Sequence, residues 1–115
     1  MYHLAKKLPS VKLLKERFEI DSSSPTGLRY KSDVGIKIKS GQVAGTYSSV
    51  YNRWNVGINY EKFQVSRIVW KLAYGTDPEQ VIDHIDNNPM NNDISNLRDI
   101  SQGDNMTRGR WGKEI

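Results

Sequence analysis

The stretch that decides the fold runs from residue 81 to residue 106 and reads VIDHIDNNPMNNDISNLRDISQGDNM, from Val81 to Met106. Six of its residues are asparagine. Asparagine is poor in the interior of helices and strands but common in turns, because its side chain bonds to nearby backbone groups. We therefore expect two short strands, at residues 81–85 and 97–100, joined by a structured loop from Asp86 to Asn96.

A short helix is expected after the second strand. Ser101 can cap it, and Asp104 falls in or near the first turn, where the helix dipole favours an acid. The helix would run through Asn105 towards Arg108. Gly103 weakens it, so its length is left open.

The strongest helical pattern of the chain lies upstream of this stretch. Apolar residues recur at the spacing of one helix face, and Gly75 stands where the helix should stop. The stripe consists of Val65, Ile68, Val69, Leu72 and Ala73. We expect this helix to form the centre of the core. Arg67, Lys71 and Tyr74 share another face, which is either solvated or in contact with phosphate.

The N-terminal part predicts one more helix and several strands. Ser10 is placed as an N-cap for a helix at about 11–18. From Gly27 to Val65 apolar residues alternate as they do in strands, with a hairpin turn at 59–62. The alternating sets are Leu28 and Tyr30, Ile36 and Ile38, Trp54, Val56 and Ile58, and Phe63 and Val65. Arg53, Asn55 and Gly57 then lie on the face opposite the apolar set. The fold class is α+β, with a small antiparallel sheet and a core helix.

Composition limits the kinds of protein that this chain can be. Its 115 residues suit one domain, and the absence of cysteine excludes disulfides and thiolate zinc sites. We expect no zinc, no membrane span and a cytoplasmic location. Residues 1–75 hold 13 Lys/Arg and five Asp/Glu, whereas residues 76–100 hold one Arg and six acids. A basic frame attracts polyanions and a compact acidic segment attracts a divalent cation, so nucleic acid and a metal are the indicated partners.

Six residues of the C-terminal stretch carry a resemblance to a known family. Asp83-His84, Asn96-Leu97-Arg98 and Asn105 resemble the HNH nucleases, in particular the small homing-type endonucleases of bacteriophages and introns. Upstream, 18–21, 26–28 and 66–70 are similar to the N-terminal half of the phage proteins. The resemblance covers about 10–108. It implies one HNH nuclease domain over 1–115, with the N-terminal elements in 1–75, a ββα-metal motif in 76–108 and a basic tail in 109–115.

The resemblance also implies a role for each motif residue. His84 would be the general base that takes a proton from the attacking water, since histidine can do so near neutral pH. Asp83 and Asn105 would hold one divalent ion, Mg²⁺ or Mn²⁺, through hard oxygen ligands. Asn96 would brace the loop and help to orient His84. Neighbouring strand residues point to opposite faces, so Asp83 and His84 can serve one phosphate only if the strand end twists or bulges.

The sequence departs from the family pattern at two positions. Ser66 precedes Arg67 where phage relatives often have His, and Asn105 stands where other branches have His. The first departure puts an auxiliary role for position 66 in doubt, whereas Asn105 remains a competent oxygen ligand. Arg98 can form a structural bridge to Asp99 or to acids of the loop, or it can reach a phosphate, and we favour the bridge. The candidate DNA contacts are Arg53, Arg67, Lys71, Arg98, Arg108 and Arg110.

Two functions remain open at this point. The first is a metal-dependent endonuclease acting on double-stranded DNA as a monomer or homodimer in a bacterial or phage-infected cell. The alternative is a DNA-binding module that has lost catalysis. A calcium loop of the EF-hand type is excluded, since starting at Asp83 puts Ile85 third and starting at Asp86 puts Met90 fifth, where oxygen ligands are needed.

Overall fold

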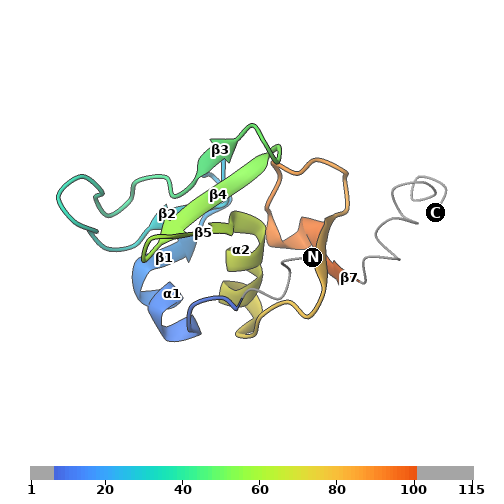
Figure 1. The fold of residues 1–115 in the computed structure, drawn as a ribbon, viewed down its shortest axis with the longest axis horizontal. Coiled ribbons are helices and arrows are strands. Elements are labelled where there is room, and N and C mark those ends of the chain that lie inside the picture. Colours follow the sequence, from blue (N-terminus) through green and yellow to red (C-terminus); the bar gives the residue numbers. More distant parts are fainter. Residues whose placement is uncertain (1–6, 101–115) are drawn as a thin grey trace.

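The computed structural model describes residues 7–100, and its elements are shown in Figure 1. It has two α-helices, one short 3-10 turn and seven strands in three small antiparallel sheets. The helices are α1 (Val11–Arg17) and α2 (Val65–Tyr74), and the 3-10 turn is η2 (Ile94–Asn96). The strands are β1 (Phe18–Ile20), β2 (Leu28–Tyr30), β3 (Thr46–Ser48), β4 (Arg53–Ile58), β5 (Glu61–Gln64), β6 (Val81–His84) and β7 (Leu97–Ile100). The α+β class with small antiparallel sheets is confirmed.

The first helix forms where the sequence predicts it. The Ser10 hydroxyl accepts a hydrogen bond from the Leu13 N–H at 3.2 Å and so caps the first turn. Leu14 is fully buried. The helix ends at Arg17, and Phe18 begins β1, which pairs with β2. The Phe18 and Tyr30 rings pack with their centroids 5.2 Å apart, which anchors this small sheet to the core.

The alternation of Ile36 and Ile38 does not form a strand, so that prediction is wrong. The N–H of Val34 donates to the Ile38 carbonyl at 2.9 Å, which closes a tight turn between them. Gly35 takes φ +64° in this turn, and Ile36 is 88% exposed. Two apolar residues without a strand partner on either side cannot hold an extended segment in place.

The three-stranded sheet has the order β3-β4-β5. The alternation of apolar residues predicts β4 and β5 but not β3. Val56 and Ile58 of β4 are buried, whereas Asn55 and Gly57 are more exposed on the opposite face, as the alternation predicts. The hairpin turn is shorter than 59–62. Asn59 and Tyr60 alone form it, both with positive φ, and β5 already begins at Glu61.

Helix α2 is the centre of the core, as predicted. It contacts α1, β1, β4, β5 and η2, and Val65, Ile68 and Val69 are fully buried. Gly75 ends it at φ +82° in the left-handed conformation, and its N–H bonds to the Lys71 carbonyl. One hydrophobic cluster unites N-terminal residues with Ile82 of β6 and with β7, so the β6–β7 hairpin shares the core of the preceding elements.

Of the face of α2 that was expected to be solvated or in contact with phosphate, Tyr74 is exposed, whereas Arg67 and Lys71 are not solvated. Arg67 and Lys71 are each only 7% exposed. The Arg67 guanidinium donates to the Gln80 carbonyl at 3.1 Å, and the Lys71 ammonium lies 2.6 Å from the Asp77 carboxylate. Both cations therefore stabilise the connection from α2 to β6. Within residues 7–100, no helix is both long and apolar enough to cross a membrane.

Candidate active site

The β6–β7 hairpin carries Asp83 and His84 at the end of its first strand. Its register is regular, with Asp83 opposite Arg98 and His84 opposite Leu97. A bulge, one of the two ways in which Asp83 and His84 could serve one phosphate, is therefore not present within these strands. Asp83 and His84 leave β6 on opposite faces, and the strand ends at His84 where the chain turns into the loop.

Asp83 is an almost buried carboxylate with a partner on the neighbouring strand. Its residue is 7% exposed, and its Oδ2 lies 3.0 Å from Nη2 of Arg98. A carboxylate at this depth needs a compensating charge, and the guanidinium supplies it. Arg98 thus forms a structural bridge, as the sequence favours, but its partner is Asp83 of β6 and not Asp99 or an acid of the loop.

The ring of His84 is held by Asn92. Nε2 of His84 lies 2.8 Å from Oδ1 of Asn92, whose residue is 4% exposed. The Asn92 amide nitrogen donates to the Thr26 carbonyl at 3.2 Å. From sequence, Asn92 is one of the turn-forming asparagines of the loop from Asp86 to Asn96, and the orientation of His84 is assigned to Asn96. Nothing in the sequence distinguishes Asn92 from the adjacent Asn91, so this contact could not have been found there.

Asn96 joins the two ends of the loop. Its Oδ1 accepts from the Asp86 N–H at 3.0 Å, and its Nδ2 donates to the Asp86 carboxylate and to the Asn91 carbonyl, each at 2.9 Å. Its own carbonyl accepts from the Ile85 N–H at 2.8 Å. Asn96 therefore contacts the loop backbone on both sides, and it reaches His84 only through the loop that it holds.

Asp86 is the acceptor at the centre of the loop. The Asn91 side-chain amide and the Asn88 N–H bond to its carboxylate and lower its pKa, with the Asn96 amide and the charge of His84 acting in the same direction. Burial acts on the pKa in the opposite direction, and its effect is smaller than that of the bonds from Asn91 and Asn88. The rest of the loop is shaped by similar short-range hydrogen bonds. In each, a side-chain oxygen of Asn88, Asn91 or Asp93 accepts from the backbone N–H two residues further on.

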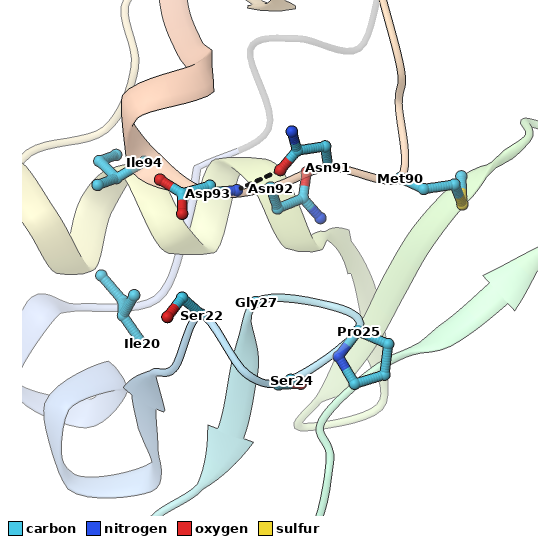
Figure 2. A pocket seen from close by; sticks show the side chains of 10 residues that line it. All are labelled: Ile20, Ser22, Ser24, Pro25, Gly27, Met90, Asn91, Asn92, Asp93 and Ile94. Atoms are coloured by element: carbon cyan, nitrogen blue, oxygen red, sulfur yellow. Dashed lines mark hydrogen bonds between the residues drawn. The ribbon is translucent and has the colours of Figure 1, made fainter. Parts of the chain in front are cut away.

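Two contacts from the N-terminal half fix the loop from outside. The Trp54 indole N–H of β4 donates to the Met90 carbonyl at 3.2 Å, and Asn92 binds Thr26 as described above. Between the 22–27 loop and the 90–94 loop lies an open groove of about 430 Å³, and Figure 2 shows Asn92 on its wall beside Gly27. The loop that contains Asn92, the partner of His84, is thus held in place partly by residues far upstream in the sequence.

The predicted basic contacts fall into three groups. Arg53 lies on the outer face of β4, half-buried, with its Nε donating to the Tyr51 carbonyl at 3.2 Å. Arg67, Lys71 and Arg98 bind a carbonyl or a carboxylate of the protein itself. The helix expected after β7 lies outside the described residues, and so do Asn105, Arg108 and Arg110.

The residues that the structure describes supply only part of a metal site. Among residues 7–100, no group of three or more His, Cys, Asp or Glu side chains is arranged to hold an ion. Asp83 provides one hard oxygen donor, of the kind that Mg²⁺ and Mn²⁺ prefer. One of its oxygens bonds to Arg98. An ion with few protein ligands and several waters fits this donor set, and a closed structural site does not.

Comparison with known families assigns this part of the chain. Residues 63–107 match the family model of the HNH endonucleases. The match begins in β5 and includes α2, the β6–β7 hairpin and the loop that holds His84. No curated protein and no solved structure matches the chain. Residues 63–107 are therefore similar to the HNH endonucleases.

Proposed function

We propose that this protein is a metal-dependent DNA endonuclease of the homing type, in which His84 activates the attacking water. The observation that carries the proposal is the bond from the His84 ring to Asn92 at the end of β6, inside the segment that matches the family. A general base must be held in one orientation to be effective, and a buried amide partner supports that role.

The proposed reaction is hydrolysis of a phosphodiester. His84 accepts a proton from water while the water oxygen bonds to phosphorus and the bond to the 3′ oxygen breaks. The leaving oxygen takes a proton from solvent, so the products carry 5′-phosphate and 3′-hydroxyl ends. Asp83 and Asn105 would hold one Mg²⁺, with Mn²⁺ as a substitute, and the ion supplies Lewis-acid stabilisation of the developing charge. The phosphate would bind at the end of β6, where the strand stops at His84.

The proposed DNA-binding surface is the outer face of the β3–β4–β5 sheet. Cross-strand pairing puts Arg53 beside Ser48, and Asn55 between Thr46 and Gln64. Side chains of these types bond to phosphates and base edges. The excess of basic residues in 1–75 favours the same partner. Arg67, Lys71 and Arg98 are less suited to phosphate contact because each already binds a protein group.

The test is cleavage of supercoiled plasmid by the purified protein with Mg²⁺, with Mn²⁺ and with chelator. We expect nicked or linear plasmid only with the metals. His84→Ala should lower the rate by about 10²- to 10⁴-fold, the range for loss of a general base. Lys39→Met, purified in the same way, changes an exposed residue outside the proposed site and controls for a contaminating nuclease.

Two outcomes would contradict the proposal. If His84→Ala cleaves as fast as wild type, the general base is wrong. If neither metal supports cleavage of plasmid or of phage genomic DNA, while the protein binds both in a salt-dependent way, the chain is a DNA-binding module instead.

A further inference from the structure

We infer that Asn92 is the positioning residue of His84. Two hydrogen bonds, one between the Asn92 amide and the Thr26 carbonyl and one between Asn92 and the His84 ring, form a relay that fixes which ring nitrogen is free to accept a proton. The relay links the 22–27 loop, outside the segment that matches the family, to the side chain at the centre of the proposed chemistry. The use of the free nitrogen in catalysis rests on the proposed function. The orientation and protonation of the ring do not.

The direction of each hydrogen bond follows from its chemistry. The Thr26 carbonyl can only accept, so the Asn92 amide must turn its NH₂ group towards it, at 3.2 Å. This leaves the Asn92 carbonyl oxygen facing Nε2 of His84 at 2.8 Å. That oxygen can also only accept, so Nε2 must carry the proton. In the neutral ring, Nδ1 is then the unprotonated nitrogen.

The start of the relay is itself held in place. The Thr26 hydroxyl donates to the Ala44 carbonyl at 2.6 Å, and Thr26 is fully buried. Within residues 7–100, Nδ1 of His84 has no hydrogen-bond partner, so the ring is anchored through Nε2 alone in this part of the chain. The anchored nitrogen and the available nitrogen are therefore different atoms, as a general base requires.

Aspartate in place of Asn92 would break the relay at its first bond. A carboxylate accepts and cannot donate, so it would face the Thr26 carbonyl with two acceptors at 3.2 Å. It would still accept from Nε2 of His84. Asn92→Asp therefore separates the two bonds that Asn92→Ala removes together.

The first test is nitrogen-15 NMR of the histidine rings at alkaline pH, at which an imidazole is neutral. The chain has two histidines, and His3→Gln identifies the signals of His84. We expect wild type to carry its proton on Nε2, with slow exchange against water. Asn92→Ala should exchange this proton about tenfold faster, and Asn92→Asp should keep it. A proton on Nδ1 in wild type, or equal exchange in Asn92→Ala, would overturn the inference without any measurement of cleavage.

The second test asks whether the relay can be disturbed from its far end. Gly27 has φ +90°, and a Cβ there would lie 3.3 Å from Cβ of Asn92. Gly41 has φ +89° with nothing within 4 Å, so it is a matched control for backbone strain. Gly27→Ala should speed exchange of the His84 proton, and Gly41→Ala should not. If the two variants leave the His84 signal equally unchanged, the 22–27 loop plays no part in positioning it.

The third test separates positioning from structure by kinetics. Asn92→Ala should lower kcat by about 10- to 100-fold and leave the KM for DNA unchanged, because a misoriented base does not weaken substrate binding. Asn92→Asp should recover part of this loss. A folded Asn92→Ala protein with wild-type kcat would refute the positioning role while leaving the nuclease itself established.

Discussion

Arg98 and Asp83 face each other across the β6–β7 hairpin, with Nη2 of Arg98 3.0 Å from Oδ2 of Asp83. Only 8% of the Asp83 side chain is exposed, against 39% for Arg98. Within the described part of the chain, Nε of Arg98 is buried and has no hydrogen-bond partner. The bridge thus depends on one end of the guanidinium, and the burial of Asp83 makes that contact necessary.

Loss of this bridge should destabilise the fold. Breaking a fully buried pair costs about 3–5 kcal/mol, because the remaining charge is left without compensation. Arg98 is partly exposed and water can replace some of its effect, so we expect Arg98→Met to lower the free energy of unfolding by about 1–3 kcal/mol. Urea denaturation measures the difference.

An exposed pair of the same chain provides the control for the Arg98 variant. Lys39 and Asp33 lie 3.8 Å apart with side chains 63% and 58% exposed. Lys39→Met should change the free energy of unfolding by no more than about 0.5 kcal/mol. Equal effects of Lys39→Met and Arg98→Met would show that the burial of Asp83 does not govern the strength of its bridge.

The indole N–H of Trp54 is expected to stabilise the loop through the Met90 carbonyl. Trp54→Phe removes this donor and keeps an aromatic ring, so it should lower the free energy of unfolding by about 0.5–1.5 kcal/mol and speed exchange of the backbone amides in 90–92. Trp70→Phe is the matched control, since Trp70 packs against Tyr74 at 4.4 Å between ring centroids. Faster exchange in both variants alike would contradict a specific role for the indole N–H.

The stability of the loop should depend on pH through Asp86. Its pKa is lowered in the folded state, chiefly by the Asn91 amide, so the carboxylate contributes stability above its unfolded pKa of about 3.9. That contribution is lost as the pH falls through the lower, folded pKa. The difference in unfolding free energy between wild type and Asp86→Asn should therefore shrink from about pH 6 to about pH 2.

Asn91→Ala tests the cause of the Asp86 shift. It removes the largest contribution, so the pKa of Asp86 should move up towards its ordinary value. Carbon-13 NMR of the Asp86 carboxyl follows this titration directly. A pKa of Asp86 that is the same in wild type and in Asn91→Ala would show that the side-chain amide is not the cause.

The positions of Arg53 and Lys71 predict that only Arg53 contributes to DNA binding. Arg53→Gln should weaken binding and reduce the slope of log K against log salt by about one, as expected when one phosphate contact is lost. Lys71→Met should leave the slope unchanged and lower stability, because its ammonium binds Asp77 at 2.6 Å. Binding titrations at several salt concentrations, with urea unfolding of both variants, separate the two effects.

Local rules predicted most of the framework from the sequence. The Ser10 cap, the apolar stripe from Val65 and the glycine stop at Gly75 each depend on a few neighbouring residues, and each is found in the structure. The β6–β7 hairpin was predicted for the same reason, since its asparagine-rich loop interrupts two short apolar runs. Such features need no knowledge of distant parts of the chain.

The failures concern contacts between distant residues. Arg67 and Lys71 lie on a polar face by spacing, yet Gln80 and Asp77 cover that face once the chain returns from α2 to β6. The assignment of a strand to Ile36 and Ile38 failed because no partner strand lies beside them. The role of Asn92 depends on Thr26, 66 positions earlier, and no local pattern contains that information.

The bonds from Trp54 and Thr26 to the loop have a consequence for how such hairpins can be exchanged between proteins. Recombination that moved the family segment alone would leave behind the indole of β4 and the carbonyl that orients Asn92. The transplanted loop would keep its sequence motif and lose the two hydrogen bonds that hold it in place from outside. Chimeras that carry residues 22–58 together with the hairpin should retain the geometry around His84. The segment needed to hold the loop therefore begins well upstream of the sequence motif.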